Sequence, residues 1–189
     1  PYYEAERRWQ KTAIHPRWHI SSAAFYMYRI AESPYARKLI RQALLDATIN
    51  NKRVIFNQSF NDGIANFLII RILQEAKRAT VDVLNPKEKQ AVFAWIANRV
   101  SFGIAAQDTE NRAALGAVYW LYVAQFLNEE KIIPDSTFAE YKKKIDEKFE
   151  LSVKETIDEK TSQYKEHGSF TLHYHIVEAY MVLAYGSFT

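Results

Sequence analysis

The sequence contains no cysteine, and glycine and proline each account for only five of its 189 residues. Without cysteine, the chain cannot form disulfides, thiolate metal sites or cysteine nucleophiles. Sandwiches and barrels need a turn about every 8–12 residues, and such turns use glycine, proline and asparagine–glycine pairs. The scarcity of these residues therefore argues against those folds and favours a mostly helical protein.

Long apolar segments are also absent. The longest uncharged run, residues 113–128, contains polar residues and is shorter than the ~20 apolar residues that a membrane span needs. Hydrophobic residues make up 48% of the chain and the net charge is +3, which argues against disorder and low complexity. We expect a single helical domain over residues 1–189. The start at Pro1, without Met or an apolar leader, indicates a processed protein or a fragment of a longer one.

Charge is unevenly distributed along the chain. The formal charge is +6 over residues 1–85 and −3 over residues 86–189, and nine of the eleven arginines lie in the first part. The planar guanidinium group suits carboxylates and phosphates, so the asymmetry is compatible with an anionic partner. The alternative is that these arginines only solvate helix surfaces. No nucleic-acid motif is present and the basic residues are spread over several segments, so nucleic acid is not an expected partner.

Helical periodicity and capping residues predict a series of helices with short connections. The expected helices cover residues 16–32, 35–49, a segment after the Asn61–Gly63 cap, a segment from Pro86, residues 110–128, a segment from Pro134, and residues 171–185. A polar loop is expected over residues 160–169. No fixed sequence repeat is visible, so a solenoid is not predicted.

Two of these helices differ in character. The 110–128 helix is apolar on most sides and should be buried. The helix from Pro134 has apolar residues at every fourth position, with charged residues between them, which is typical of an outer helix. These apolar residues are Tyr141, Ile145, Phe149, Val153 and Ile157. The alternation of inner and outer helices predicts an all-α fold of stacked antiparallel helical hairpins.

The first candidate site lies at the start of the 110–128 helix. A helix N-terminus presents unpaired N–H groups and a positive dipole end, which attract anions. Asn111 and Arg112 stand there, and both side chains can bind a carboxylate. The alternative is that Asp108 or Thr109 only caps the helix.

The second candidate site is the segment from His167 to His175. It contains three of the five histidines together with Tyr174, and these groups can transfer protons. The alternative is that some of these groups are core residues and the others are solvated. On a helix, His173 and His175 point about 200° apart, so we do not expect a metal site.

Together the two clusters resemble motifs of the α/α-toroid alginate lyases. The run LHYHIVEAYMVLA, residues 172–184, is similar to the segment in which a Tyr-His pair opens a late helix of those enzymes. The run ENRAALGA, residues 110–117, is similar to their Asn-Asn-His motif at the start of an inner helix. The resemblance covers about residues 105–188 and implies a partial or incomplete (α/α) toroid, without a cofactor, in a secreted or periplasmic protein.

The resemblance implies β-elimination on a uronate-containing acidic polysaccharide. Asn111 and Arg112 would bind the uronate carboxylate, and Tyr174 would act as the acid and base. His175 or His167 is the competing base. Arg112 occupies the position of the family's histidine and cannot act as a base, because it stays protonated.

Other residues have supporting roles in this interpretation. Lys165 and His167 occupy the neighbourhood in which the family places an arginine, and aromatic residues such as Trp18 would stack on sugar rings. At helical spacing, however, such aromatic residues also suit the core. The alternative function is a non-catalytic helical-hairpin module that binds an acidic glycan or a protein.

Overall fold

The computed structural model describes residues 34–50, 59–105, 110–158, 160–161, 163–164 and 183–187. The helices in these ranges are α3 (Pro34–Ala47), α4 (Ser59–Arg78), α5 (Pro86–Ala105), α6 (Glu110–Glu129) and α7 (Asp135–Thr156). Two short strands, β1 (Ile157–Asp158) and β2 (Gln163–Tyr164), pair antiparallel after α7. Residues 183–186 form one further helical turn. The described part is therefore helical, as the sequence predicts.

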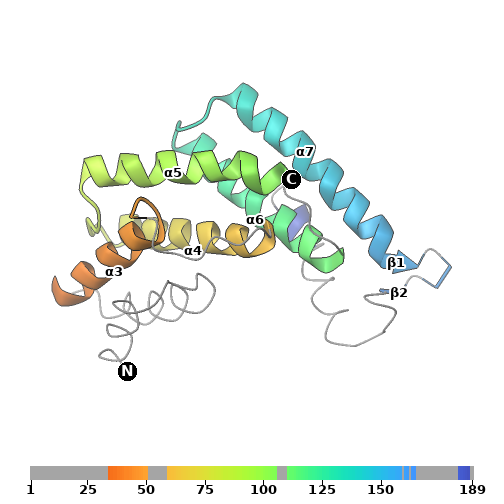
Figure 1. Ribbon diagram of the computed structural model, residues 1–189, viewed down its shortest axis with the longest axis horizontal. Coiled ribbons are helices and arrows are strands. Elements are labelled where there is room, and N and C mark those ends of the chain that lie inside the picture. Colours follow the sequence, from red (N-terminus) through yellow and green to blue (C-terminus); the bar gives the residue numbers. More distant parts are fainter. Residues whose placement is uncertain are drawn as a thin grey trace.

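Helices α4 and α5 run back alongside one another, as Figure 1 shows. Helix α6 packs most extensively against α7 and α4, and it also contacts α5. Helix α3 lies against α5. Each of the helices α4, α5 and α7 thus covers part of α6, which explains why α6 has almost no polar face.

The core is centred on α6, in agreement with the predicted inner helix. The largest fully buried side chains are Trp120, Ile40, Leu44, Ile69, Ile70, Ile96, Leu121, Leu127 and Ile145. Removing such side chains from water is the main contribution to folding, about 25 cal/mol per Å² of apolar surface. Among the described helices, none combines the length and apolar character that a bilayer crossing requires.

The indole of Trp120 packs against two glycines. A Cβ atom at Gly103 of α5 would lie 2.1 Å from Trp120 Cε2, and one at Gly63 of α4 would lie 3.2 Å from Trp120 Nε1. Real Cβ atoms do not approach another atom as closely as 2.1 Å. Two of the chain's few glycines are therefore used where helices approach the tryptophan, rather than in turns.

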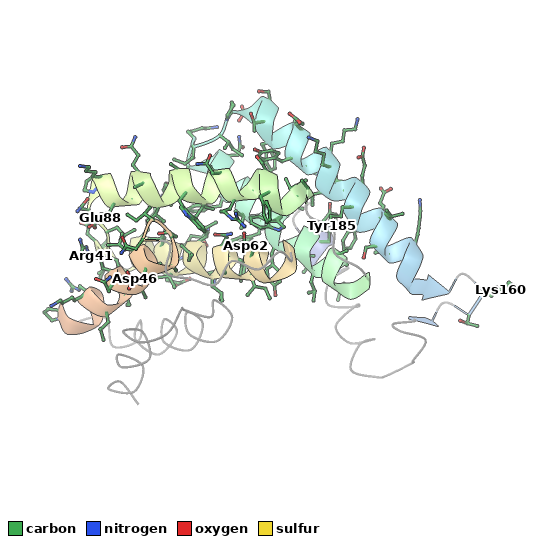
Figure 2. All side chains as sticks on the ribbon, viewed as in Figure 1. Arg41, Asp46, Asp62, Glu88, Lys160 and Tyr185 are labelled. Atoms are coloured by element: carbon green, nitrogen blue, oxygen red, sulfur yellow. The ribbon has the colours of Figure 1, made fainter. Side chains whose placement is uncertain are left out.

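Helix α5 begins at Pro86, as predicted, and its start forms a reciprocal capping box. The Asn85 side chain accepts a hydrogen bond from the Glu88 amide at 2.9 Å, and the Asn85 amide donates to Glu88 Oε2 at 3.1 Å. The same carboxylate binds the guanidinium of Arg41, whose Nε donates to Glu88 Oε2 at 3.0 Å. Figure 2 shows Arg41 and Glu88 side by side. Glu88 thereby joins α3 to the start of α5.

This arrangement predicts a pH dependence of stability. The hydrogen bonds from Arg41, and next from the Asn85 amide, hold the pKa of Glu88 below its ordinary value. Because the folded-state pKa is lowered, the stabilisation is present above the unfolded pKa of about 4.3 and is lost as the pH falls through the folded pKa.

We expect the melting temperature of wild type to exceed that of Glu88→Gln at neutral pH, and the difference to shrink below about pH 4.3. Thermal unfolding followed by circular dichroism from pH 7 to pH 3 measures this difference. Glu147→Gln is the control, because the Glu147 side chain is 65% exposed and lies 4.0 Å from its lysine partner. A Glu88→Gln difference that stays constant with pH would contradict the assignment.

Helices α4 and α6 both end in a Schellman motif without glycine. Thr80 and Lys131 adopt φ angles of 54° and 58° after these helices. At the end of α4, the amide of Val81 donates to the carbonyl of Ala76 at 2.9 Å, and at the end of α6 the same type of bond joins Ile132 to Leu127. Non-glycine residues therefore occupy positions that commonly take glycine, consistent with the low glycine content.

Several helix boundaries differ from the predictions. Helix α4 begins at Ser59, so Asn61–Gly63 lies inside the helix and does not cap it. Helix α3 ends at Ala47, two residues earlier than predicted. Helix α7 ends at Thr156, so Ile157 lies beyond the helix and pairs with Tyr164 in the strand pair β1–β2. This pair also occupies part of the predicted polar loop.

Candidate functional site

The first predicted cluster is positioned by the start of α6. Because α6 begins at Glu110, Asn111 and Arg112 lie in its first turn, where backbone N–H groups have no partner within the helix. The side chains of Asn111 and Arg112 are outside the described part of the structure. Behind them, Ala113, Ala114 and Ala117 are buried, so α6 is closely covered from its second turn onward.

The other predicted site residues lie outside the described residues. They are Tyr174, His175, His167, Lys165 and Trp18. The described turn at residues 183–187 follows the second cluster along the chain. Strand β2 (Gln163–Tyr164) precedes the same cluster, so these two described segments flank it along the chain.

This C-terminal turn is attached to α7 through Tyr185. The Tyr185 ring stacks on Phe149 with a centroid distance of 3.9 Å and an interplanar angle of 3°. Its hydroxyl donates a hydrogen bond to Asp146, which also pairs with Lys142 at 2.9 Å. Because α7 packs along α6, the turn lies on a direct neighbour of the helix that carries Asn111 in its first turn.

Tyr185 itself is not suited to act as a base. Burial, and then the hydrogen bond and negative charge of Asp146, raise its pKa above the ordinary value. A tyrosine base needs the opposite, a pKa lowered by nearby cations. The contacts of Tyr185 with Phe149 and Asp146 indicate a structural role, in which it fastens the end of the chain to α7.

A buried polar cluster between α4 and α5 was not predicted. The Asp62 side chain is 2% exposed, and the Arg99 side chain is 17% exposed. Arg99 Nε donates to Asp62 Oδ2 at 2.9 Å, and Arg99 Nη2 lies 2.8 Å from the same oxygen. The guanidinium also stacks over Phe102 at 4.2 Å. Asp62 was interpreted as part of a helix cap, but the structure uses it as the partner of a buried arginine.

Next to this pair, Asn66 is fully buried and its amide nitrogen donates to the carbonyl of Asp62 at 2.9 Å. Within the part of the chain that is described, Asn66 Oδ1 has no hydrogen-bond partner. The only sequence signal for this cluster was an arginine within the mostly apolar segment from Val92 to Val100. Periodicity alone cannot show which helix supplies the matching carboxylate.

The pair leads to a prediction about stability. We expect Arg99→Met to lower the free energy of unfolding by about 3 kcal/mol, because it removes the cation facing a buried carboxylate. Urea unfolding followed by circular dichroism measures the loss. Arg78→Met makes the same change at an arginine that is 67% exposed and paired with Glu75, and should cost less than about 1 kcal/mol.

The double variant Asp62→Leu/Arg99→Met distinguishes the stability lost with the ion pair from the stability lost with side-chain packing. It should recover part of the stability that Arg99→Met loses, since no buried charge then remains at this site. Equal losses for Arg99→Met and Arg78→Met would contradict a buried ion pair.

Several of the arginines in the first half of the chain form ion pairs within the protein. Arg41 binds Glu88, while Arg71 and Arg78 both bind Glu75, at 3.4 and 2.7 Å. The pKa of Arg71 is raised above its ordinary value, first by a hydrogen bond to the Tyr122 hydroxyl. These arginines therefore contribute less to attracting an anion than their number suggests.

Within the described ranges, no three histidine, cysteine or acidic side chains come together in a way that suits a metal ion. Comparisons of the chain with protein-family models, with curated proteins and with solved structures found no match. Any function for this chain is therefore argued from its own residues.

Proposed function

We propose that this protein is a polysaccharide lyase-like protein that cleaves a uronate-containing acidic polysaccharide by β-elimination. The observation that carries the proposal is the start of α6 at Glu110, which puts Asn111 and Arg112 in the first turn of a buried helix. Backbone N–H groups and the helix dipole favour an anion at this position. A uronate carboxylate is such an anion.

The attachment of the C-terminal turn supports the proposal. Tyr185 holds this turn against α7, and α7 packs along α6. The described turn that follows Tyr174 and His175 along the sequence is thus held by a neighbour of α6, the helix that carries Asn111 in its first turn. A site needs both clusters in one cleft, and this connection is compatible with that requirement. The proposal includes an arrangement of the hairpins as part of an (α/α) toroid.

The proposed reaction begins with the carboxylate at C5 of the uronate. Asn111 donates a hydrogen bond to it and Arg112 adds a positive charge, which makes the C5 proton more acidic and stabilises the negative charge of the transition state. Tyr174 removes the C5 proton, or His175 or His167 does so. The electron pair forms the C4–C5 double bond as the bond from C4 to the glycosidic oxygen breaks. That oxygen receives a proton from Tyr174.

The remaining predicted residues would bind the polymer. Lys165 and His167 would contact the carboxylates of neighbouring sugars, and Trp18 would stack on a sugar ring. A free tyrosine titrates near pH 10, so Tyr174 requires nearby cations if it is to act as the base. Arg112, His175 and Lys165 are the candidates for these cations.

The proposal is tested by incubating the protein with alginate and with other polyuronates while following ultraviolet absorbance. Elimination conjugates the new double bond with the carboxylate, so the absorbance should rise with at least one polyuronate. A neutral polysaccharide is the control and should give no rise. The absence of a rise with every polyuronate would reject the lyase proposal for this chain.

The second candidate is a non-catalytic module that binds an acidic glycan or a protein. It is favoured by Arg112, which stands where the resembling enzymes carry a histidine and which cannot accept a proton. Salt-sensitive binding of a polyuronate without a rise in absorbance would support this function.

A further inference from the structure

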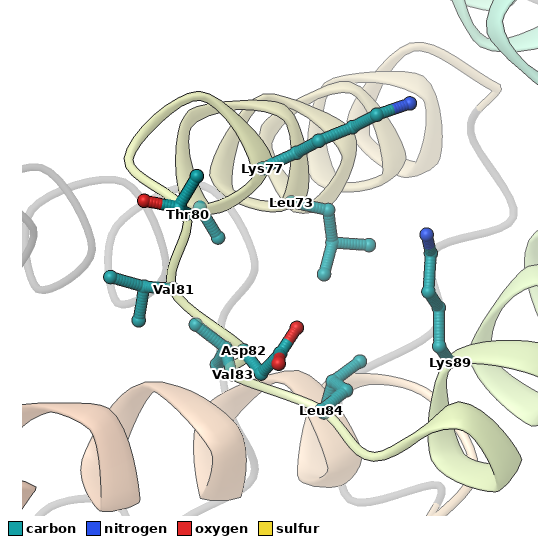
Figure 3. Close-up of a pocket in the computed structure, with 9 residues that line it drawn as sticks. Leu73, Lys77, Thr80, Val81, Asp82, Val83, Leu84 and Lys89 are labelled. Carbon is teal, nitrogen blue, oxygen red and sulfur yellow. The ribbon is translucent and has the colours of Figure 1, made fainter.

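A cavity of about 350 Å³ lies where α4 ends and α5 begins (Figure 3). Its lining residues are Leu73, Ala76, Lys77, Thr80, Val81, Asp82, Val83, Leu84 and Lys89. Small-molecule sites usually measure about 300–1,000 Å³ and combine an apolar lining with a few polar groups. Five of the nine lining residues are apolar, so the cavity has the size and character of a site for a small ligand.

The cationic side of the cavity is formed by two lysines that share one carboxylate. Lys77 Nζ lies 2.8 Å from Glu130 Oε1, and Lys89 Nζ lies 3.8 Å from Glu130 Oε2. Lys77 is thus the more tightly held of the two. One carboxylate cannot neutralise two ammonium groups, so Lys89 remains available to bind a further anionic group.

The anionic side of the cavity is formed by Asp82. Figure 3 shows its carboxylate pointing into the space below Lys77 and Lys89. Within the described part of the chain, no ion pair joins Asp82 to either lysine, so the opposite charges face the same cavity without contact. A ligand that carries both charges would complete both interactions.

The backbone beside Asp82 is strained. Thr80 lines the cavity and has a φ angle of 54°, a conformation that β-branched residues rarely adopt. This conformation belongs to the Schellman motif that ends α4. It sets the path of residues 81–84, which supply Asp82 and three apolar residues to the lining of the cavity.

We propose that this cavity binds an α-amino acid with an apolar side chain. The ligand carboxylate pairs with Lys89, the ammonium group pairs with Asp82, and the side chain covers Leu73, Val81 and Leu84. This site is separate from the proposed catalytic site. Glu130 follows the C-terminal end of α6, a 20-residue helix about 30 Å long, whereas Asn111 lies at its beginning.

Three ligands that share one apolar group test the proposal. They are L-leucine, 4-methylpentanoate, which lacks the ammonium group, and 3-methylbutylamine, which lacks the carboxylate. Isothermal titration calorimetry with the whole protein should show that leucine binds roughly tenfold more tightly than either analogue, since each lost charge removes a charge-assisted hydrogen bond.

Matched variants assign the two charges. Asp82→Asn should weaken leucine binding roughly tenfold and leave 4-methylpentanoate binding unchanged. Lys89→Gln should weaken leucine and 4-methylpentanoate but leave 3-methylbutylamine unchanged. Lys143→Gln is the control, because the side chain of Lys143 is 79% exposed and belongs to α7, away from the cavity. Circular dichroism of each variant checks that the fold is intact.

Each result decides the question. A preference for leucine that depends on Asp82 and Lys89 supports the proposal. No leucine binding, equal affinities for the three ligands, or equal affinities of the variants and the wild type would overturn it. Cleavage of polyuronates does not enter this measurement, so the two proposals succeed or fail separately.

Discussion

Changing Tyr174 to phenylalanine is expected to abolish polyuronate cleavage, with a loss of about 100-fold or more in rate, and to leave the fold intact. The hydroxyl is the only group removed, and in the proposed reaction it protonates the leaving glycosidic oxygen. Without that proton the oxygen would leave as an alkoxide, which is a poor leaving group at neutral pH. The rate of the rise in ultraviolet absorbance measures the effect.

Tyr185→Phe is the matched control, since it removes the same hydroxyl from the same end of the chain. Tyr185 donates to Asp146, so this variant should lose about 1 kcal/mol of stability and keep its activity. Asn111→Ala should also reduce cleavage, because the uronate carboxylate loses a hydrogen-bond donor.

Full activity in Tyr174→Phe would remove Tyr174 from the reaction. His175 and His167 would then be the remaining candidates for proton transfer. A loss of helical circular dichroism in Tyr174→Phe, with activity retained in Tyr185→Phe, would instead assign Tyr174 a structural role.

Gly103→Ala should lower the free energy of unfolding by about 3 kcal/mol. The added Cβ would lie 2.1 Å from Cε2 of Trp120, and this indole is only 1% exposed. A buried ring has no space into which it can retreat, so α5 and α6 must separate. The cost exceeds the gain of about 1 kcal/mol that alanine normally brings to a helix interior. Urea unfolding measures the difference.

Gly63→Ala is the control for the same substitution against the same indole. Its Cβ would lie 3.2 Å from Trp120 Nε1, a contact that a shift of a few tenths of an ångström relieves. The helix propensity of alanine should offset that cost, leaving a change within about 1 kcal/mol of zero. In the Gly103→Ala background, Trp120→Leu should destabilise much less than in wild type, since the clash is then absent.

A Gly103→Ala variant as stable as the wild type would contradict the close packing of α5 against Trp120. Equal destabilisation by Gly63→Ala and Gly103→Ala would show that loss of glycine, and not the position of the indole, causes the effect.

Much of the helical arrangement could be predicted from local patterns. Asn85 and Pro86 mark the start of α5, and the apolar stripe of α7 places Ile145 and Phe149 in the core. An ion pair joins Glu140 and Lys144, four residues apart on α7, at 2.6 Å. These features depend on residues within one or two helical turns, so the nearby sequence is sufficient to predict them.

Patterns that depend on a partner helix were predicted less well. In α4, Phe67 and Leu68 are only half-buried, whereas Ala65 and Ile69 are fully buried. Helix α4 is apolar on several sides, so periodicity does not distinguish the side facing α6 from the side facing α5. The orientation of α4 depends on both neighbours.

In the candidate site, too, some features follow from the local sequence and others depend on how distant segments pack. Capping and periodicity place Asn111 in the first turn of an inner helix, and the structure confirms that helix start. The distance from Asn111 to Tyr174 depends on how segments more than 60 residues apart pack, and the site therefore stays a prediction. The cavity beside Asp82 and Lys89 was not predicted, because it forms only where the end of α4 meets the start of α5.

The low content of glycine and proline, the lack of cysteine and the helical periodicity were enough to establish that the described part of this protein is helical. Those properties act over a few neighbouring residues, through backbone conformation and hydrogen bonds between successive turns. Tertiary structure alone decided that Asp62 meets Arg99 and that Gly103 faces Trp120. Both contacts join different helices, and their geometry depends on how those helices pack against one another.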